Sequence, residues 1–296
     1  MKKEDYPNYF NAADDLSIKA QKRYLFLMKI NSWSMIVASA LSIYNWQETT
    51  PMLCIYIITG FLFLVTIISS LILALKKYEN IWYRGRALAE SCKTLTWRFI
   101  TCSELFENNI DTEEIERRFK QRIKEIYNKY DGLAKDVDTK NLSHKHIITE
   151  EMRRIRNLPT VERKDYYITY RIKEQKDWYA NKAENNNEKY RKWYILIILF
   201  QILSLISIIY LVKVPDCHYN FIGLFTTIAA SAIGWMQLKQ HQELKQAYTT
   251  AAEELNYIEE LSDSITTEEK LSAFVLDAEN AISREHTLWL AQYRKI

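Results

Sequence analysis

The chain has 296 residues, of which 48% are hydrophobic and 26% charged, and its formal net charge is +3 at pH 7. It contains 5 glycines and 4 prolines, which excludes a disordered chain and a turn-rich β-sandwich and predicts an all-α protein. The phosphate-binding patterns GxxxxGKS/T and GxGxxG do not occur, so the loops of nucleotide-dependent enzymes are missing. We expect no enzyme, with no catalytic residue, no cofactor and no metal.

Four uncharged stretches are long enough to cross a membrane as helices. They are residues 30–47, 53–75, 193–212 and 221–238. About 20 apolar residues, each rising about 1.5 Å, span the hydrocarbon core, where only helices or closed barrels satisfy the backbone. Tryptophans, which concentrate at membrane interfaces, bracket them at Trp33, Trp46, Trp193 and Trp235. We predict four transmembrane helices. The alternative is that the shortest are core helices of a soluble bundle.

The distribution of Lys and Arg predicts the orientation of these spans. The two loops that close the hairpins, 48–52 and 213–220, contain Lys213 as their only basic residue. Because basic residues stay in the cytoplasm, both termini and the central segment are predicted there, with both hairpin tips outside. Cys54 and Cys217 both fall near the outer surface, where they either pair as a disulfide or serve as small apolar residues.

Further helices are predicted in the charged segments. Asp111 and Glu114 resemble a capping box, and the helix after them has one apolar face made of Ile115, Phe119, Ile123, Ile126 and Tyr130. Residues 131–146 read as a loop, and another helix is expected to start after Pro159 and run into the third span. The last helix is expected from about Thr266, burying Leu271, Phe274, Ala278, Ile282, Trp289 and Tyr293.

The two halves of the chain are similar to each other. Leu75-Lys76 aligns with Leu238-Lys239, and Ala89-Glu90 aligns with Ala252-Glu253 in the same register. An even number of spans separates the copies, so they form parallel repeats related by an axis along the membrane normal. We predict a first hairpin with its stalk at 1–134, a connecting segment at 135–159, and a second hairpin with its cytosolic helices at 160–296.

Each hairpin is followed by an apolar stripe that repeats every 3.5 residues, as in a coiled coil. The stripe predicts that the second and fourth spans continue as long cytosolic helices that couple them rigidly to the cytosolic domain. The predicted coupling residues are Ile81, Leu88, Leu95, Leu244, Ala251 and Leu255.

The spans hold no internal charge, which excludes a proton relay or a voltage sensor. They do contain small and polar residues that either line a pore or pack helices against one another. These residues are Thr59, Thr66, Ser70, Gln201, Ser204, Gly223, Thr227 and Gly234.

Outside the spans, two groups of side chains suggest chemistry. His144 and His146 are spaced as metal ligands can be, but they lack partnering residues, so a solvated loop is the favoured interpretation. Three arginines, Arg153, Arg154 and Arg156, could bind phosphates. Glu150 and Glu151 lie on the same helix and neutralise its charge. No nucleic-acid partner is expected.

Two segments resemble a known family. One runs Tyr167-Ile168-Thr169-Tyr170-Arg171, Glu174-Gln175, Trp178-Tyr179, Lys182-Ala183, Asn185 and Arg191-Lys192-Trp193. It looks like the entry to a SLATT domain, the SMODS- and SLOG-associating two-transmembrane effector domain. The other runs Tyr9, Ala12-Ala13-Asp14, Ser17 and Lys19 to Leu25, and it resembles the entry to another class of the same family. Together they indicate two tandem copies.

The resemblance implies a membrane effector of bacterial antiphage conflict systems that forms pores or perturbs the inner membrane when triggered. It implies a nucleotide-second-messenger synthase or sensor encoded nearby as a partner. The uncharged spans predict the lipid membrane as a partner, and a homo-oligomer is predicted because four spans pack without a lumen and a pore needs several protomers around it. Two other functions stay open: a membrane-anchored scaffold that recruits a sensor without conducting, and a constitutive channel for a small solute.

Overall fold

The computed structural model describes residues 1–44, 49–130, 133, 142 and 146–293. This part of the chain is helical, and its one β-type contact is an isolated bridge between Tyr44 and Tyr219. The helices are α1 Asn8–Leu41, α2 Thr49–Lys76, α3 Tyr78–Ile100, α4 Thr112–Lys129, α6 Glu150–Arg156, α7 Thr160–Tyr167, α8 Glu174–Lys213, α9 Ile222–Lys239, α10 His241–Leu261 and α11 Glu268–Tyr293. A π-helical segment, Ile168–Lys173, joins α7 to α8. The prediction of an all-α protein is confirmed.

The helices form two compact units, and each unit draws on both halves of the chain. We call Lys22–Tyr78 with Ala183–Gln246 the apolar unit, and Met1–Gln21 with Glu79–Lys182 and Ala247–Ile296 the polar unit. The predicted boundaries between the repeats, around 135–159, remain a prediction.

Three helices are long and apolar enough to cross a membrane. They are Asn8–Leu41, Pro51–Lys76 and Thr160–Lys213. In the apolar 18-residue stretch of each helix, only 11%, 6% and 11% of the residues are buried, respectively. Their large side chains point outward, as Phe61 at 63% and Leu75 at 78% exposed illustrate. Such surfaces suit lipid better than water. The predicted loop at 48–52 is, from Thr49 onward, the first turn of α2.

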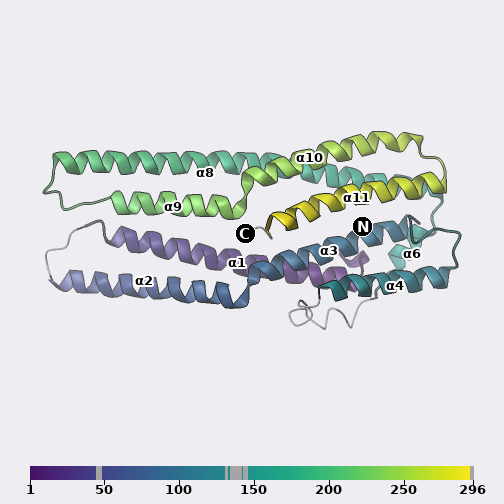
Figure 1. Ribbon diagram of the computed structural model, residues 1–296, viewed down its shortest axis with the longest axis horizontal. Coiled ribbons are helices and arrows are strands. Elements are labelled where there is room, and N and C mark those ends of the chain that lie inside the picture. The colour runs from purple at the N-terminus through teal and green to yellow at the C-terminus, as the bar shows by residue number, and fades with distance from the viewer. Residues whose placement is uncertain (45–48, 131–132, 134–141, 143–145, 294–296) are drawn as a thin grey trace. The chain divides into compact units, whose positions relative to one another are not determined.

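Contacts inside the apolar unit set the order of its helices. The Asn31 side chain of α1 donates to the Ser70 hydroxyl of α2 at 3.0 Å. The Thr227 hydroxyl of α9 donates to Ser39 of α1 at 3.2 Å, and the Phe200 and Phe225 rings join α8 to α9 with centroids 5.8 Å apart. Thus α1 contacts both α2 and α9, and α9 contacts α8 (Figure 1).

The polar unit is built around α3. Leu88, Trp97 and Ile100 are completely buried there, and the first part of α1 packs closely on α3 because Gly85 has no side chain. A Cβ at Gly85 would lie 3.2 Å from the carbonyl oxygen of Ala13, too close for most residues.

Two sequence predictions about helix ends are confirmed in the polar unit. The Asp111 carboxylate accepts from the backbone N–H of Glu113 at 3.0 Å and caps α4, as expected of an N-cap aspartate. The helix after Pro159 runs without interruption from Thr160 into α8. Most of the predicted loop 131–146 and the side chains of Trp289 and Tyr293 lie outside the described residues.

The expected continuation of the second and fourth spans as unbroken helices is wrong. Lys77, between α2 and α3, and Gln240, between α9 and α10, both adopt left-handed backbone conformations with φ of 46°. Each closes its helix by donating its N–H to the carbonyl four residues earlier, Lys77 to Leu73 at 3.1 Å and Gln240 to Met236 at 2.9 Å. This is the αL cap that ends helices. The two positions are equivalent in the repeat, so each copy breaks at the same place.

Candidate functional site

The residues predicted on the spans divide between helix contacts and exposed surfaces. Ser70 and Thr227 make the hydroxyl contacts to α1 described above, and a Cβ on Gly223 would lie 3.5 Å from the Ser39 hydroxyl. Buried Ser204 donates to the carbonyl of Phe200 in its own helix at 2.9 Å. The remaining members are half-buried or exposed: Thr59, Thr66, Gln201 and Gly234. The structure therefore brings three of the eight to α1.

The predicted coupling residues lie on the inner faces of α3 and α10. Leu88 is completely buried and Leu95 is 7% exposed, while Ala251 and Leu255 are buried in the second copy. Ile81 and Leu244, nearest the helix breaks, are half-buried. The faces were predicted in the right register, although each helix starts anew after a left-handed residue.

The polar unit contains a buried ion pair that the sequence analysis did not identify. Arg171 donates its Nε and Nη2 to the two carboxylate oxygens of Glu279, both at 2.7 Å, and Tyr167 donates its hydroxyl to Glu279 at 3.0 Å. The side chains of Arg171 and Glu279 are 1% and 0% exposed. A parallel two-bond contact of this kind is the strongest geometry for a guanidinium and a carboxylate.

The pair controls the charge of its members. Burial by itself would lower the pKa of Arg171, but the charge and hydrogen bonds of Glu279 outweigh burial and raise that pKa above its ordinary value. Burial and the Glu279 charge raise the pKa of Tyr167 well above its usual range. Arg171 is therefore a permanent cation and Tyr167 a permanent hydrogen-bond donor.

Helix geometry brings these side chains together. Tyr167 and Arg171 are four residues apart at the start of the π-helical segment, so both face α11. On α11, Glu279 continues a row with Leu271 and Val275 at intervals of four, and all three are completely buried. A glutamate in register with an apolar row is the sequence signal that could have marked this site.

A pocket of about 490 Å³ lies beside Arg171. Its lining comes from the N-terminal residues before α1 and from four helical segments, α1, α3, the π-helical segment and α8. It includes Lys3, Tyr6, Phe10, Asp14, Arg86, Lys93, Tyr170, Arg171, Glu174, Gln175 and Trp178. The Tyr6 hydroxyl accepts from the Trp97 indole at 3.1 Å at the inner wall. Cationic and aromatic side chains thus face the same space.

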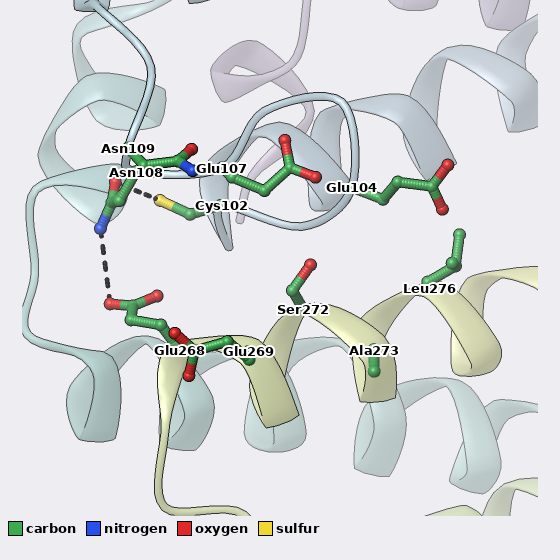
Figure 2. A pocket seen from close by; sticks show the side chains of 10 residues that line it. All are labelled: Cys102, Glu104, Glu107, Asn108, Asn109, Glu268, Glu269, Ser272, Ala273 and Leu276. Carbon is green, nitrogen blue, oxygen red and sulfur yellow. Dashed lines mark hydrogen bonds between the residues drawn. The ribbon is translucent and has the colours of Figure 1, made fainter.

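A second pocket, of about 630 Å³, is acidic. Figure 2 shows Glu104, Glu107 and Asn108 of the α3–α4 connection facing Glu268 and Ser272 of α11. Glu268 also accepts from Thr160 at 2.6 Å and contacts the buried guanidinium of Arg163. Within the ranges that the structure describes, no group of three or more His, Cys, Asp or Glu side chains is placed to hold a metal ion.

The three arginines considered for phosphate binding are all engaged. Arg153 pairs with Glu116 at 2.7 Å and Arg154 with Glu151 at 2.7 Å. Arg156 is buried and donates to the carbonyls of Phe99 at 2.5 Å and Phe106 at 2.8 Å.

The remaining predicted side chains give two results. His144 lies outside the described residues, and His146 is exposed. Cys54 and Cys217 are free thiols in the structure.

Comparison with known proteins gives two matches in tandem. The family model for SMODS and SLOG-associating 2TM effector domain 3 matches residues 7–164, and the model for SMODS and SLOG-associating 2TM effector domain 1 matches residues 167–289. The second match begins at Tyr167 and contains both members of the Arg171–Glu279 pair. Searches among curated proteins and among solved structures found no match.

Proposed function

Because the chain belongs to the family of SMODS- and SLOG-associating two-transmembrane effector domains, with two copies in tandem, we propose that it is a membrane effector of a bacterial antiphage conflict system that forms pores or disrupts the inner membrane when triggered. The observation that carries the proposal is the coincidence of these matches with membrane-length helices whose apolar side chains face outward. Its proposed partners are lipid, further copies of the chain and a SMODS or SLOG protein encoded nearby.

The proposal counts α9 as the fourth span. Its 18 residues extend about 27 Å at about 1.5 Å per residue, which approaches the hydrocarbon thickness of a bilayer. Residues 222–238 carry no charge. Contacts of α9 with both α1 and α8 support a common environment for the four helices. The scarcity of basic residues in the hairpin loops favours outer tips and cytoplasmic termini.

An unsatisfied side-chain amide on α8 supports the proposed homo-oligomer. Gln201 is exposed in the middle of an apolar span, and it has no hydrogen bond within the described part of the chain. Leaving an amide unpaired in hydrocarbon costs roughly 2 to 7 kcal/mol. Gln201 shares its helix face with the exposed side chains of Tyr194, Ile198 and Leu205. Another protomer or a water-filled lumen would satisfy this amide, and a single protomer of four spans leaves no lumen of its own.

The test is leakage in bacterial cells that express the chain, followed with a potential-sensitive dye and an impermeant DNA dye. We expect depolarisation and dye entry with the natural sequence and much less of both with Gln201→Leu. The matched control is Ser204→Ala, which removes a buried hydroxyl bonded within its own helix and should leak normally. Membrane fractionation and crosslinking verify insertion and assembly.

Two results would contradict the proposal. Inserted, oligomeric protein that never depolarises the membrane, even in phage-infected cells, would favour the scaffold function. Steady leakage that depends on one solute and does not harm growth would favour a constitutive channel.

A further inference from the structure

The pocket beside Arg171 has the size and walls of a ligand site. At about 490 Å³ it falls within the range of about 300 to 1,000 Å³ typical of small-molecule pockets. Four separate helical segments contribute to its lining, and all of them belong to the polar unit. One wall is the π-helical segment, a rare geometry that occurs often at functional sites.

Two of the cationic residues that line this pocket, Arg171 and Lys93, have unused hydrogen-bond donors. Arg171 gives its Nε and Nη2 to Glu279, but its Nη1 is buried and has no hydrogen-bond partner. Lys93 of α3 is half-buried and forms no ion pair with the residues that the structure describes. Burial lowers the pKa of Lys93, which is the signature of an ammonium group without sufficient compensation. A buried donor without an acceptor destabilises the folded protein, and an anion would remove this penalty at both groups.

The other charges of the pocket largely cancel one another. Asp14 pairs with Lys3 and, at 3.4 Å, with Arg86, and Arg86 also contacts Glu90 at 2.6 Å. Glu174 is exposed on the lining, where water solvates its carboxylate. The hydrogen-bond donors that remain unpaired on the inner wall therefore belong to two cationic residues, Lys93 and Arg171.

Aromatic rings complete the site. Tyr170 and Trp178 line the pocket and are 43% and 38% exposed, unlike Tyr6 and Phe10, which are buried. Exposed rings beside cationic donors offer flat surfaces to an unsaturated ring.

We propose that this pocket binds a small phosphate monoester that carries a flat ring, the chemical class of mononucleotides. Lys93 and the Nη1 of Arg171 hold the phosphate, and Tyr170, the more exposed of the two rings, covers the ring of the ligand. A phosphate suits this pair of donors because it offers several strongly accepting oxygens to a guanidinium and an ammonium group at once. The proposal goes beyond the membrane function and does not depend on it.

The experiment is calorimetric titration of the detergent-purified full chain with inorganic phosphate, adenosine monophosphate and adenosine. We expect the tightest saturable binding for adenosine monophosphate, weaker binding for phosphate and none for adenosine. Lys93→Gln should weaken both phosphate-bearing probes about tenfold or more, because hydrogen bonds between charged groups contribute about 1.5 to 3 kcal/mol. Lys124→Gln on α4, an exposed lysine outside the pocket, is the matched control and should bind as the natural chain does.

A second substitution tests the ring. Tyr170→Leu should weaken adenosine monophosphate severalfold and leave inorganic phosphate unchanged. Thermal melting of each variant checks folding, and if Lys93→Gln melts early, Lys93→Arg keeps the charge and should retain binding. The proposal is overturned by the absence of saturable binding of adenosine monophosphate, by equal effects of Lys93→Gln and Lys124→Gln, or by adenosine binding as tightly as the monophosphate. None of these readouts involves leakage, so failure here and failure of the membrane function are separate results.

Discussion

Removing the charge of Glu279 should unfold the polar unit at a much lower temperature. In Glu279→Gln the guanidinium of Arg171, 1% exposed, would lose the only carboxylate that it contacts within the described residues. Breaking one side of a buried pair costs about 3 to 5 kcal/mol. For a domain of this size each kcal/mol lowers the melting temperature by about 2 to 4 °C, so we expect a fall of about 6 to 20 °C.

The double substitution gives the sharper result. Arg171→Met with Glu279→Leu removes both charges and fills the space with apolar groups. Such replacements are often neutral or stabilising by about 1 to 4 kcal/mol, so the double variant should be more stable than either single one. The difference in a double-mutant cycle measures the coupling of the pair.

The assay is melting of the detergent-purified chain followed by tryptophan fluorescence and by protease resistance of the polar unit. Trp97 is a suitable reporter because its ring lies 5.7 Å from that of Tyr167. Asp277→Asn is the matched control, since Asp277 is exposed on α11 two residues before Glu279, and it should change stability by no more than about 0.5 kcal/mol. The reasoning is refuted if Glu279→Gln melts together with Asp277→Asn, or if the two single effects simply add in the double variant.

Three further predictions follow from the helix breaks, the helix contacts and the thiols. Lys77→Gly and Gln240→Gly should each stabilise the protein by about 0.5 to 1 kcal/mol, as measured by chemical denaturation. The left-handed conformation costs an L-residue about 1 to 2 kcal/mol, and glycine avoids this cost but loses more chain entropy on folding. Thr227→Val should weaken the packing of α9 on α1 by about 0.6 to 2 kcal/mol, as seen by melting in detergent. Burial raises the pKa of Cys92 to about 12, so its thiol should resist alkylation at about pH 8. Cys217 lies in a hairpin loop that we propose to be outside the cell, so it should react with an impermeant maleimide in intact cells.

Each of these predictions has its own control. Lys76→Gly, at the last residue of α2, should not stabilise the protein because Lys76 is helical rather than left-handed, and a gain in stability there would show that glycine does not act through the left-handed conformation. Thr226→Val removes a hydroxyl bonded within α9, and a loss as large as that of Thr227→Val would argue against the contact with α1. Because Cys54 is also free and exposed, labelling is compared in Cys54→Ser, where adding Cys217→Ser should abolish it; labelling of Cys217 only after lysis would argue for the opposite orientation.

Local sequence patterns predicted much of the secondary structure and its buried faces. The uncharged stretches predicted the three membrane-length helices, because lipid demands apolar side chains along a whole helix. The Asp111 cap and the helix after Pro159 were predictable since a carboxylate satisfies free N–H groups and proline favours the first turn. The buried faces of α4 and α11 followed from periodicity, with Ile115, Phe119 and Leu271 among the buried side chains.

The sequence by itself therefore determined the features that depend on neighbouring residues, namely the helices, their apolar faces and their caps, together with the tandem repeat. Only the tertiary structure decided the rest. Arg171 and Glu279 are 108 residues apart, and no local pattern identifies which glutamate pairs with Arg171. The fold decides the pairing by burying both side chains, because a buried charge is stable only beside an opposite charge. The helix breaks at Lys77 and Gln240 could not be predicted, because neither position is a glycine. Packing beyond the helix imposes there a left-handed conformation that the residue by itself disfavours.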